Sequence, residues 1–149
     1  MSSWPGDVTD LAALLPTGGD ELRALYAALW DVGVDPVTLE LCRLRMATLI
    51  GSTADLSMRQ PEAVAAGLTE ELVAALPAWP TAEEFTPAQR CALGFAEQFV
   101  IDAHGFTDDD MRGMHDHFTE PQLAALTTAV ATFDALARVR AALGTTEST

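Results

Sequence analysis

The apolar residues of this chain recur at helical spacing, and this pattern limits the fold more than any other feature of the sequence. Between Asp20 and Trp30 they fall on one face of an α-helix. The segment from Leu39 to Ile50 is apolar on more than one side, which predicts a central helix. No alternating pattern long enough for a convincing strand occurs. The sequence therefore predicts an all-α fold, a bundle of about seven or eight helices, two of them long.

Residues that begin and end helices divide the middle of the chain. Pro36 is expected near the first position of the central helix, and Gly51 is expected to end or bend it. A short helical stretch follows from Ser52 to Gly67. Pro61 lies inside this stretch and should either kink the helix or restart it.

Capping signals predict the later helices. Thr86 and Thr119 each precede a glutamine at the third helical position, which predicts a capping box at both sites. The last helix is expected to run from about Pro121 to Leu143.

The length of the chain is that of one domain. We expect residues 1–149 to form a single domain, with 1–19 as an N-terminal extension and 144–149 as a frayed tail.

Composition excludes several classes of function. The chain carries 8 basic and 22 acidic residues, which gives a formal net charge of −14. All the basic residues are arginine, so no lysine is available for a Schiff base or a P-loop. The acidic balance argues against nucleic acid and against a membrane surface as partners. Because the sequence has no signal peptide pattern and no membrane-spanning run, we expect a cytoplasmic protein.

Metal and thiol chemistry have little support in the sequence. No pair of potential metal ligands has a recognised spacing, so we expect no metal and no other cofactor. Cys42 and Cys91 form no CxxC pair, and we interpret both as buried free thiols. Cys42 precedes Arg43, whose charge would lower the pKa of a nearby thiol. Residual thiol peroxidase activity through either cysteine is therefore an alternative.

The stretch that starts at Glu40 resembles the core of the carboxymuconolactone decarboxylase family, which includes the alkylhydroperoxidase D-like proteins. The family pattern places a glutamate ahead of a CxxC pair and a histidine after it. Here Glu40 holds the glutamate position, while Ser52 and Asp55 hold the cysteine positions and Arg59 holds the histidine position. The resemblance covers about residues 20–143. It implies a homo-oligomer, a trimer or hexamer, of helical subunits without the family's disulfide redox activity.

Two interpretations of these four residues remain open. In the functional one, Ser52, Asp55 and Arg59 share one face of a helix that Glu40 approaches. Glu40 or Asp55 would then be the catalytic base, and Arg59, with Ser52 beside it, would bind a substrate carboxylate. In the structural one, Ser52 and Asp55 form an N-cap pair, and Glu40 and Arg59 form a buried ion pair.

These interpretations lead to different functions. We expect a cofactor-independent acid/base enzyme of the decarboxylase or isomerase type, or a binder of a small carboxylated molecule. The alternatives are a non-catalytic helical scaffold or binding module and a residual thiol antioxidant. The scaffold alternative predicts that Glu40 and Arg59 pair and leave no cavity.

Overall fold

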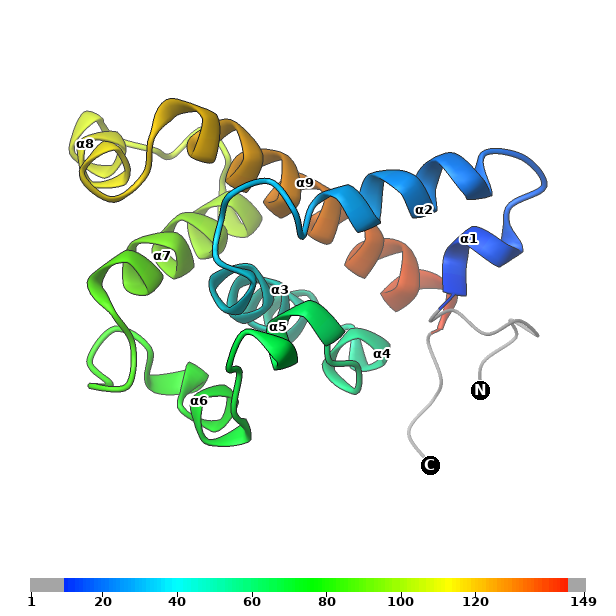
Figure 1. The fold of residues 1–149 in the computed structure, drawn as a ribbon, viewed down its shortest axis with the longest axis horizontal. Coiled ribbons are helices and arrows are strands. Elements are labelled where there is room, and N and C mark those ends of the chain that lie inside the picture. Colours follow the sequence, from blue (N-terminus) through cyan, green and yellow to red (C-terminus); the bar gives the residue numbers. More distant parts are fainter. Residues whose placement is uncertain (1–9, 145–149) are drawn as a thin grey trace.

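The computed structural model describes residues 10–144, and within that range the chain is all helices and connecting turns (Figure 1). The elements in chain order are α1 (Leu11–Leu14), α2 (Gly19–Ala28), α3 (Pro36–Ile50), α4 (Thr53–Leu56), α5 (Pro61–Ala65), α6 (Glu70–Ala74), the 3-10 helix η2 (Leu76–Ala78), α7 (Pro87–Ile101), α8 (Asp108–His117) and α9 (Glu120–Leu143). The predicted all-α fold class is confirmed. The described helices slightly exceed the expected number because two of them, α1 and α4, are only four residues long.

Helix α3 lies in the middle of the molecule and packs along α7 and α9 (Figure 1). Pro36 occupies its first turn, and the Asp35 side chain caps it by accepting the backbone N–H of Val37 at 3.2 Å. Gly51 ends it in the left-handed region, at φ 87°. Because α3 is surrounded, residues on all of its faces are buried, and its charged side chains are carried into the interior.

The stretch from Ser52 to Gly67 is two short helices. Helix α4 ends at Leu56, and α5 begins at Pro61, so of the two expected outcomes, a kink or a restart, the structure has the restart. Arg59 lies in the non-helical segment between them. The expected helix face shared by Ser52, Asp55 and Arg59 is therefore wrong.

Capping boxes fix the starts of the later helices. Both predicted boxes are present, with Thr86 and Thr119 each exchanging hydrogen bonds with the glutamine three residues later. Thr107 forms a third box with Asp110 at the start of α8. The last helix begins at Glu120, one residue earlier than predicted, and ends at Leu143 as expected.

The N-terminal extension is partly helical. Helix α1 packs on α2 and buries Leu11. Residues 1–9 and 145–149, which include most of the expected frayed tail, lie outside the described part of the chain. The single-domain organisation stays a prediction. Among the described residues, no helix combines the length and apolar character needed to cross a membrane.

An aromatic cluster fixes the end of α2 against α9. The ring of Tyr26 meets Trp30 edge-on, with centroids 5.9 Å apart, and meets Phe133 in the same way at 6.2 Å. Trp30 and Phe133 are buried, and their ring centroids lie 5.5 Å apart. The cluster holds Tyr26 beside the polar groups described next.

Candidate functional site

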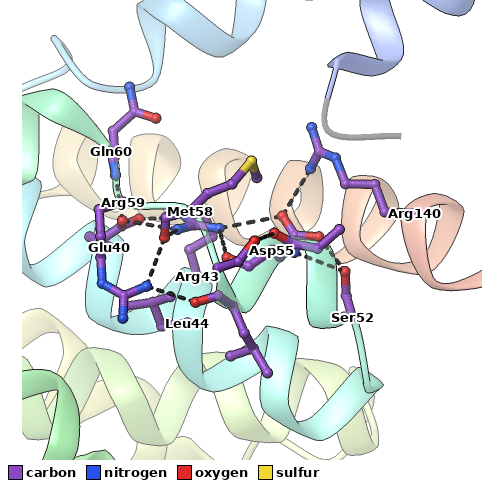
Figure 2. Close-up of polar contacts among 12 residues, drawn as sticks. Glu40, Arg43, Leu44, Ser52, Asp55, Met58, Arg59, Gln60 and Arg140 are labelled. Atoms are coloured by element: carbon purple, nitrogen blue, oxygen red, sulfur yellow. Dashed lines mark hydrogen bonds and ion pairs between the residues drawn. The ribbon is translucent and has the colours of Figure 1, made fainter. Parts of the chain in front are cut away.

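Glu40 and Arg43 pair inside the protein (Figure 2). They lie three residues apart on α3 and expose 0% and 3% of their surfaces. Nε of Arg43 donates to Oε1 of Glu40 at 2.5 Å, and Nη2 donates to Oε2 at 2.9 Å, which is bidentate pairing. Oε2 also accepts the backbone N–H of Gln60 at 2.6 Å. Both carboxylate oxygens of Glu40 are therefore engaged by donors.

The other donors of Arg43 reach the end of α4. Nη1 donates to the backbone oxygen of Asp55 at 2.9 Å and to its Oδ1 at 3.3 Å. Nη2 also donates to the backbone oxygen of Met58 at 2.9 Å. With the two bonds to Glu40, Arg43 makes as many hydrogen bonds as a guanidinium has N–H groups.

Asp55 connects this pair to α9 (Figure 2). Its Oδ1 accepts from Nη1 of Arg140 at 2.9 Å, across 85 positions of sequence. Its Oδ2 accepts from Oγ of Ser52 at 2.5 Å, and Ser52 is also the N-cap of α4. Asp55 and Ser52 expose 2% and 1% of their surfaces, so the contact is buried. We call Glu40, Arg43, Asp55 and Arg140 the ionic cluster; it contains two cations and two carboxylates.

Arg59 takes a different partner from the one the sequence suggested. Its Nε and Nη2 donate to the carboxylate of Glu70 at 2.9 and 3.0 Å. Its Nη1 donates to the backbone oxygens of Leu56 and Met58. The expected buried ion pair between Glu40 and Arg59 is wrong, because Arg43 takes both oxygens of Glu40 and Arg59 faces α6.

A cavity of about 530 Å³ lies next to the ionic cluster. Four of the chain's eight arginines line it: Arg23, Arg43, Arg59 and Arg140. Two carboxylates, Asp10 and Glu62, and apolar side chains from α1, α2 and α9 complete the wall. Of the residues predicted as the site, Arg59 lines this cavity, whereas Glu40, Ser52 and Asp55 are outside its lining.

Charge and burial set the protonation of the groups around the cavity. Burial acts to lower the pKa of Arg43, but the hydrogen bond and the charge of Glu40 outweigh it, so the pKa is raised. The hydrogen bond to Glu70 likewise raises the pKa of Arg59. Burial raises the pKa of Tyr26, which also lines the cavity. The arginines stay charged, and the phenol stays neutral at pH 7.

Neither cysteine has the environment of a reactive thiol. Cys42 is fully buried, and burial raises its pKa to about 12, so the expected lowering by Arg43 is wrong. Cys91 is half-buried rather than buried, and its Sγ lies 3.2 Å from Sδ of Met114. Its pKa is also raised, first by burial and then by two aspartates of α8. Both thiols are free, as predicted.

The buried hydrogen-bonded network contains five polar residues, of which the sequence indicated three and missed two. Glu40, Ser52 and Asp55 do lie close to one another, within one hydrogen-bonded network. Arg43 had a local signal, because it lies three positions after Glu40 in an apolar helix. Arg140 had none, since its contact with Asp55 spans most of the chain.

Comparisons with known proteins agree with the fold. No curated protein matches the chain significantly. A crystal structure of a protein of unknown function from Agrobacterium tumefaciens, provisionally assigned to antioxidant defence as AhpD, superposes with a TM-score of 0.79. The two chains are 20% identical, and the match covers 94% of this chain and 97% of the other. That likeness shows a shared fold. The model of the carboxymuconolactone decarboxylase family matches residues 21–98, just over half of the sequence. The chain therefore belongs to the carboxymuconolactone decarboxylase family.

Proposed function

We propose that this protein binds a small organic carboxylate in the arginine-lined cavity and that it does so without thiol chemistry. One observation carries the proposal. Half of the chain's arginines line a single cavity, in a protein whose formal net charge is −14. Guanidinium groups match the planar geometry of a carboxylate, and a cavity of about 530 Å³ is the size of a small-molecule site.

The residues that line the cavity include more cations than carboxylates. Its four arginines face two lining carboxylates, Asp10 and Glu62. Arg23 meets Asp10 at 3.4 Å, but both side chains are more than half exposed, so the pair is weak. The lining itself therefore presents more guanidinium groups than carboxylates, while Glu40, Asp55 and Glu70, which pair with three of these arginines, lie outside the lining. The apolar wall would bury the hydrocarbon part of a ligand carboxylate.

In this proposal Arg59 binds the ligand, whereas Arg43 forms part of the cavity wall. Arg59 is partly exposed and pairs with Glu70, whose side chain is 70% exposed. An exposed partner of this kind exchanges with solvent, so a ligand can compete for the guanidinium. The N–H groups of Arg43 are occupied inside the protein. Arg43 therefore has no N–H group left for a ligand, and Glu40 balances its charge.

Glu40 and Asp55 have positioning roles in this proposal. Their oxygens accept hydrogen bonds from arginines and from Ser52, and neither residue lines the cavity. Catalysis by either carboxylate would need one oxygen to leave its donor and reach the ligand. The catalytic assignment of Glu40 and Asp55 stays a prediction, as does assembly into a trimer or hexamer. The raised pKa values of both cysteines favour a thiol-independent function.

Calorimetric titration tests the proposal. The probes are straight-chain mono- and dicarboxylates and benzoate, each compared with its primary amide. We expect at least one carboxylate to bind and its amide not to bind. Native mass spectrometry of the purified protein would identify any acid that copurifies.

Two arginine variants locate the binding site. Arg59→Gln should weaken carboxylate binding by about tenfold, because a charge-assisted hydrogen bond is lost. The matched control is Arg112→Gln on α8, where Arg112 is 72% exposed and outside the cavity lining. It should bind like the wild type. The proposal fails if no carboxylate binds or copurifies, or if both variants bind equally well.

A further inference from the structure

We propose that the hydroxyl of Tyr26 donates a hydrogen bond to an oxygen of the ligand in the arginine-lined cavity. This inference rests on the proposed carboxylate binding and deepens it. It adds a neutral donor to the cationic groups of the site, on the helix that also carries Arg23. The cavity would then favour ligands that place an acceptor oxygen near α2.

The position of Tyr26 supports this role. Its side chain lines the cavity together with Arg43 and Arg140, and it is half-buried. All four charges of the ionic cluster also act on the pKa of Tyr26. Buried tyrosine hydroxyls usually find a hydrogen-bond partner. Among residues 10–144 no such partner is found for Tyr26, so its polar end is available to a ligand.

The packing of the ring makes this donor rigid. Trp30 and Phe133 meet it edge-on, at interplanar angles of 67° and 68°. Both neighbours belong to the buried core, so the ring cannot turn away without disturbing it. A donor held in place before binding loses little conformational freedom when the ligand arrives.

The protonation state also suits a donor. Burial raises the pKa of Tyr26 above its ordinary value of 10, so the phenol keeps its proton at pH 7. A neutral phenol donates without adding charge. Arg59 would bind the anion, and Tyr26 would select among anions by the position of their oxygens.

The test uses the fact that the chain has one tyrosine. Protein labelled with ¹³C at the ring ζ-carbon of tyrosine gives a single NMR signal, and this carbon carries the hydroxyl. The probes are the straight-chain carboxylates and benzoate used for calorimetry. We expect the signal to shift as a binding carboxylate is added. The matching primary amide should leave it unchanged.

The variant for this test is Tyr26→Phe, which keeps the aromatic packing and removes only the hydroxyl. We expect its affinity for the same carboxylate to fall by about tenfold while its urea unfolding midpoint stays at the wild-type value. If the wild type binds but its ζ-carbon signal does not move and Tyr26→Phe binds equally well, the inference is wrong and the binding proposal stands. If the wild type binds no carboxylate, both are wrong.

Discussion

At the scale of single residues, Arg43 connects several parts of the buried network. It is held by both oxygens of Glu40 and reaches the backbone at the end of α4. Burying a guanidinium is costly, and these partners offset the cost. Glu40, which holds the family's glutamate position, thus uses both of its oxygens to bind Arg43. Arg43 supplies the counter-charge that a buried Glu40 needs, and Arg59 at the histidine position pairs with Glu70 instead.

The pairing predicts that Glu40→Gln destabilises the fold. The change leaves Arg43 buried without its full counter-charge and turns one acceptor into a donor. We expect the free energy of unfolding in urea to fall by roughly 3 kcal/mol. The control is Glu70→Gln, which removes the exposed partner of Arg59 and should leave the urea midpoint nearly unchanged. Equal midpoints for the wild type and Glu40→Gln would contradict the assigned role of this pair.

Burial of Cys42 predicts slow thiol chemistry. Its pKa of about 12 leaves almost no thiolate at pH 8, and the side chain is fully buried. In a Cys91→Ser variant, we expect no reaction with Ellman's reagent under native conditions and one equivalent in urea. The complementary Cys42→Ser variant should react slowly, because Cys91 is half-buried and its pKa is also raised. Fast native labelling of Cys42 would revive the thiol antioxidant alternative.

Sequence reasoning located half of the ionic cluster. The resemblance to the family pattern indicated Glu40 and Asp55, and they do lie in one network. Arg59 was misplaced because its position was inferred from a continuous helix that ends at Leu56. Arg140 could not be found, because a contact between positions far apart in the chain leaves no local pattern.

At the scale of elements, the break between α4 and α5 shapes the site. A helix end leaves carbonyl groups without intrahelical partners. Here Arg43 and Arg59 donate to the carbonyls of Leu56 and Met58, and Arg43 also donates to that of Asp55, which accepts the backbone N–H of Met58 as well. The break thus creates acceptors that hold two of the cavity's arginines in place. A continuous helix would have used the same carbonyls internally.

Local signals predicted the helices well. Capping threonines and Pro36 marked helix starts correctly, because these residues act on backbone groups within a few positions. Pro61 was correctly read as a kink or a restart, but the sequence did not choose between them. In the structure Arg43 donates from another helix to the backbone oxygen of Met58 inside the break, a contact that no local pattern indicates.

The capping box of α9 makes a quantitative prediction. Thr119 accepts the N–H of Gln122 at 3.3 Å, and Gln122 accepts the N–H of Thr119 at 2.9 Å. Thr119→Ala should lower the free energy of unfolding by about 1 kcal/mol, because a helix-start N–H loses its acceptor. Thr127→Ala, at an exposed position inside the same helix, should change stability by less than about 0.5 kcal/mol. Similar losses in both variants would mean that the cap is not what stabilises the helix start.

At the scale of the whole molecule, charge is distributed unevenly. The formal net charge is −14, yet four arginines surround one cavity, and two of them belong to the buried ionic cluster. The remaining acidic side chains are mostly exposed, at helix starts and in loops. Long-range repulsion among these carboxylates opposes compaction, whereas the buried pairs are shielded from solvent.

This distribution predicts that salt stabilises the protein. Folding brings the exposed carboxylates closer together, so screening their repulsion favours the folded state more than the unfolded one. Raising NaCl from about 0.01 M to about 0.3 M shortens the screening length from about 30 Å to less than 10 Å. The ionic cluster should be little affected, because its partners are in contact and buried. We therefore expect the melting temperature at pH 7 to rise by a few degrees, as measured by circular dichroism.

The control is the same salt series near the calculated isoelectric point, about pH 4.2. There the net charge is close to zero, and the stabilisation by salt should shrink or disappear. If salt raised the melting temperature equally at both pH values, the cause would be a general effect of salt on apolar burial rather than screening. If salt lowered the melting temperature at pH 7, attractive surface pairs, such as Arg138 with Asp134, would outweigh the repulsion. Comparing the two pH values thus distinguishes the effect of the net charge on stability from the effect of local ion pairs.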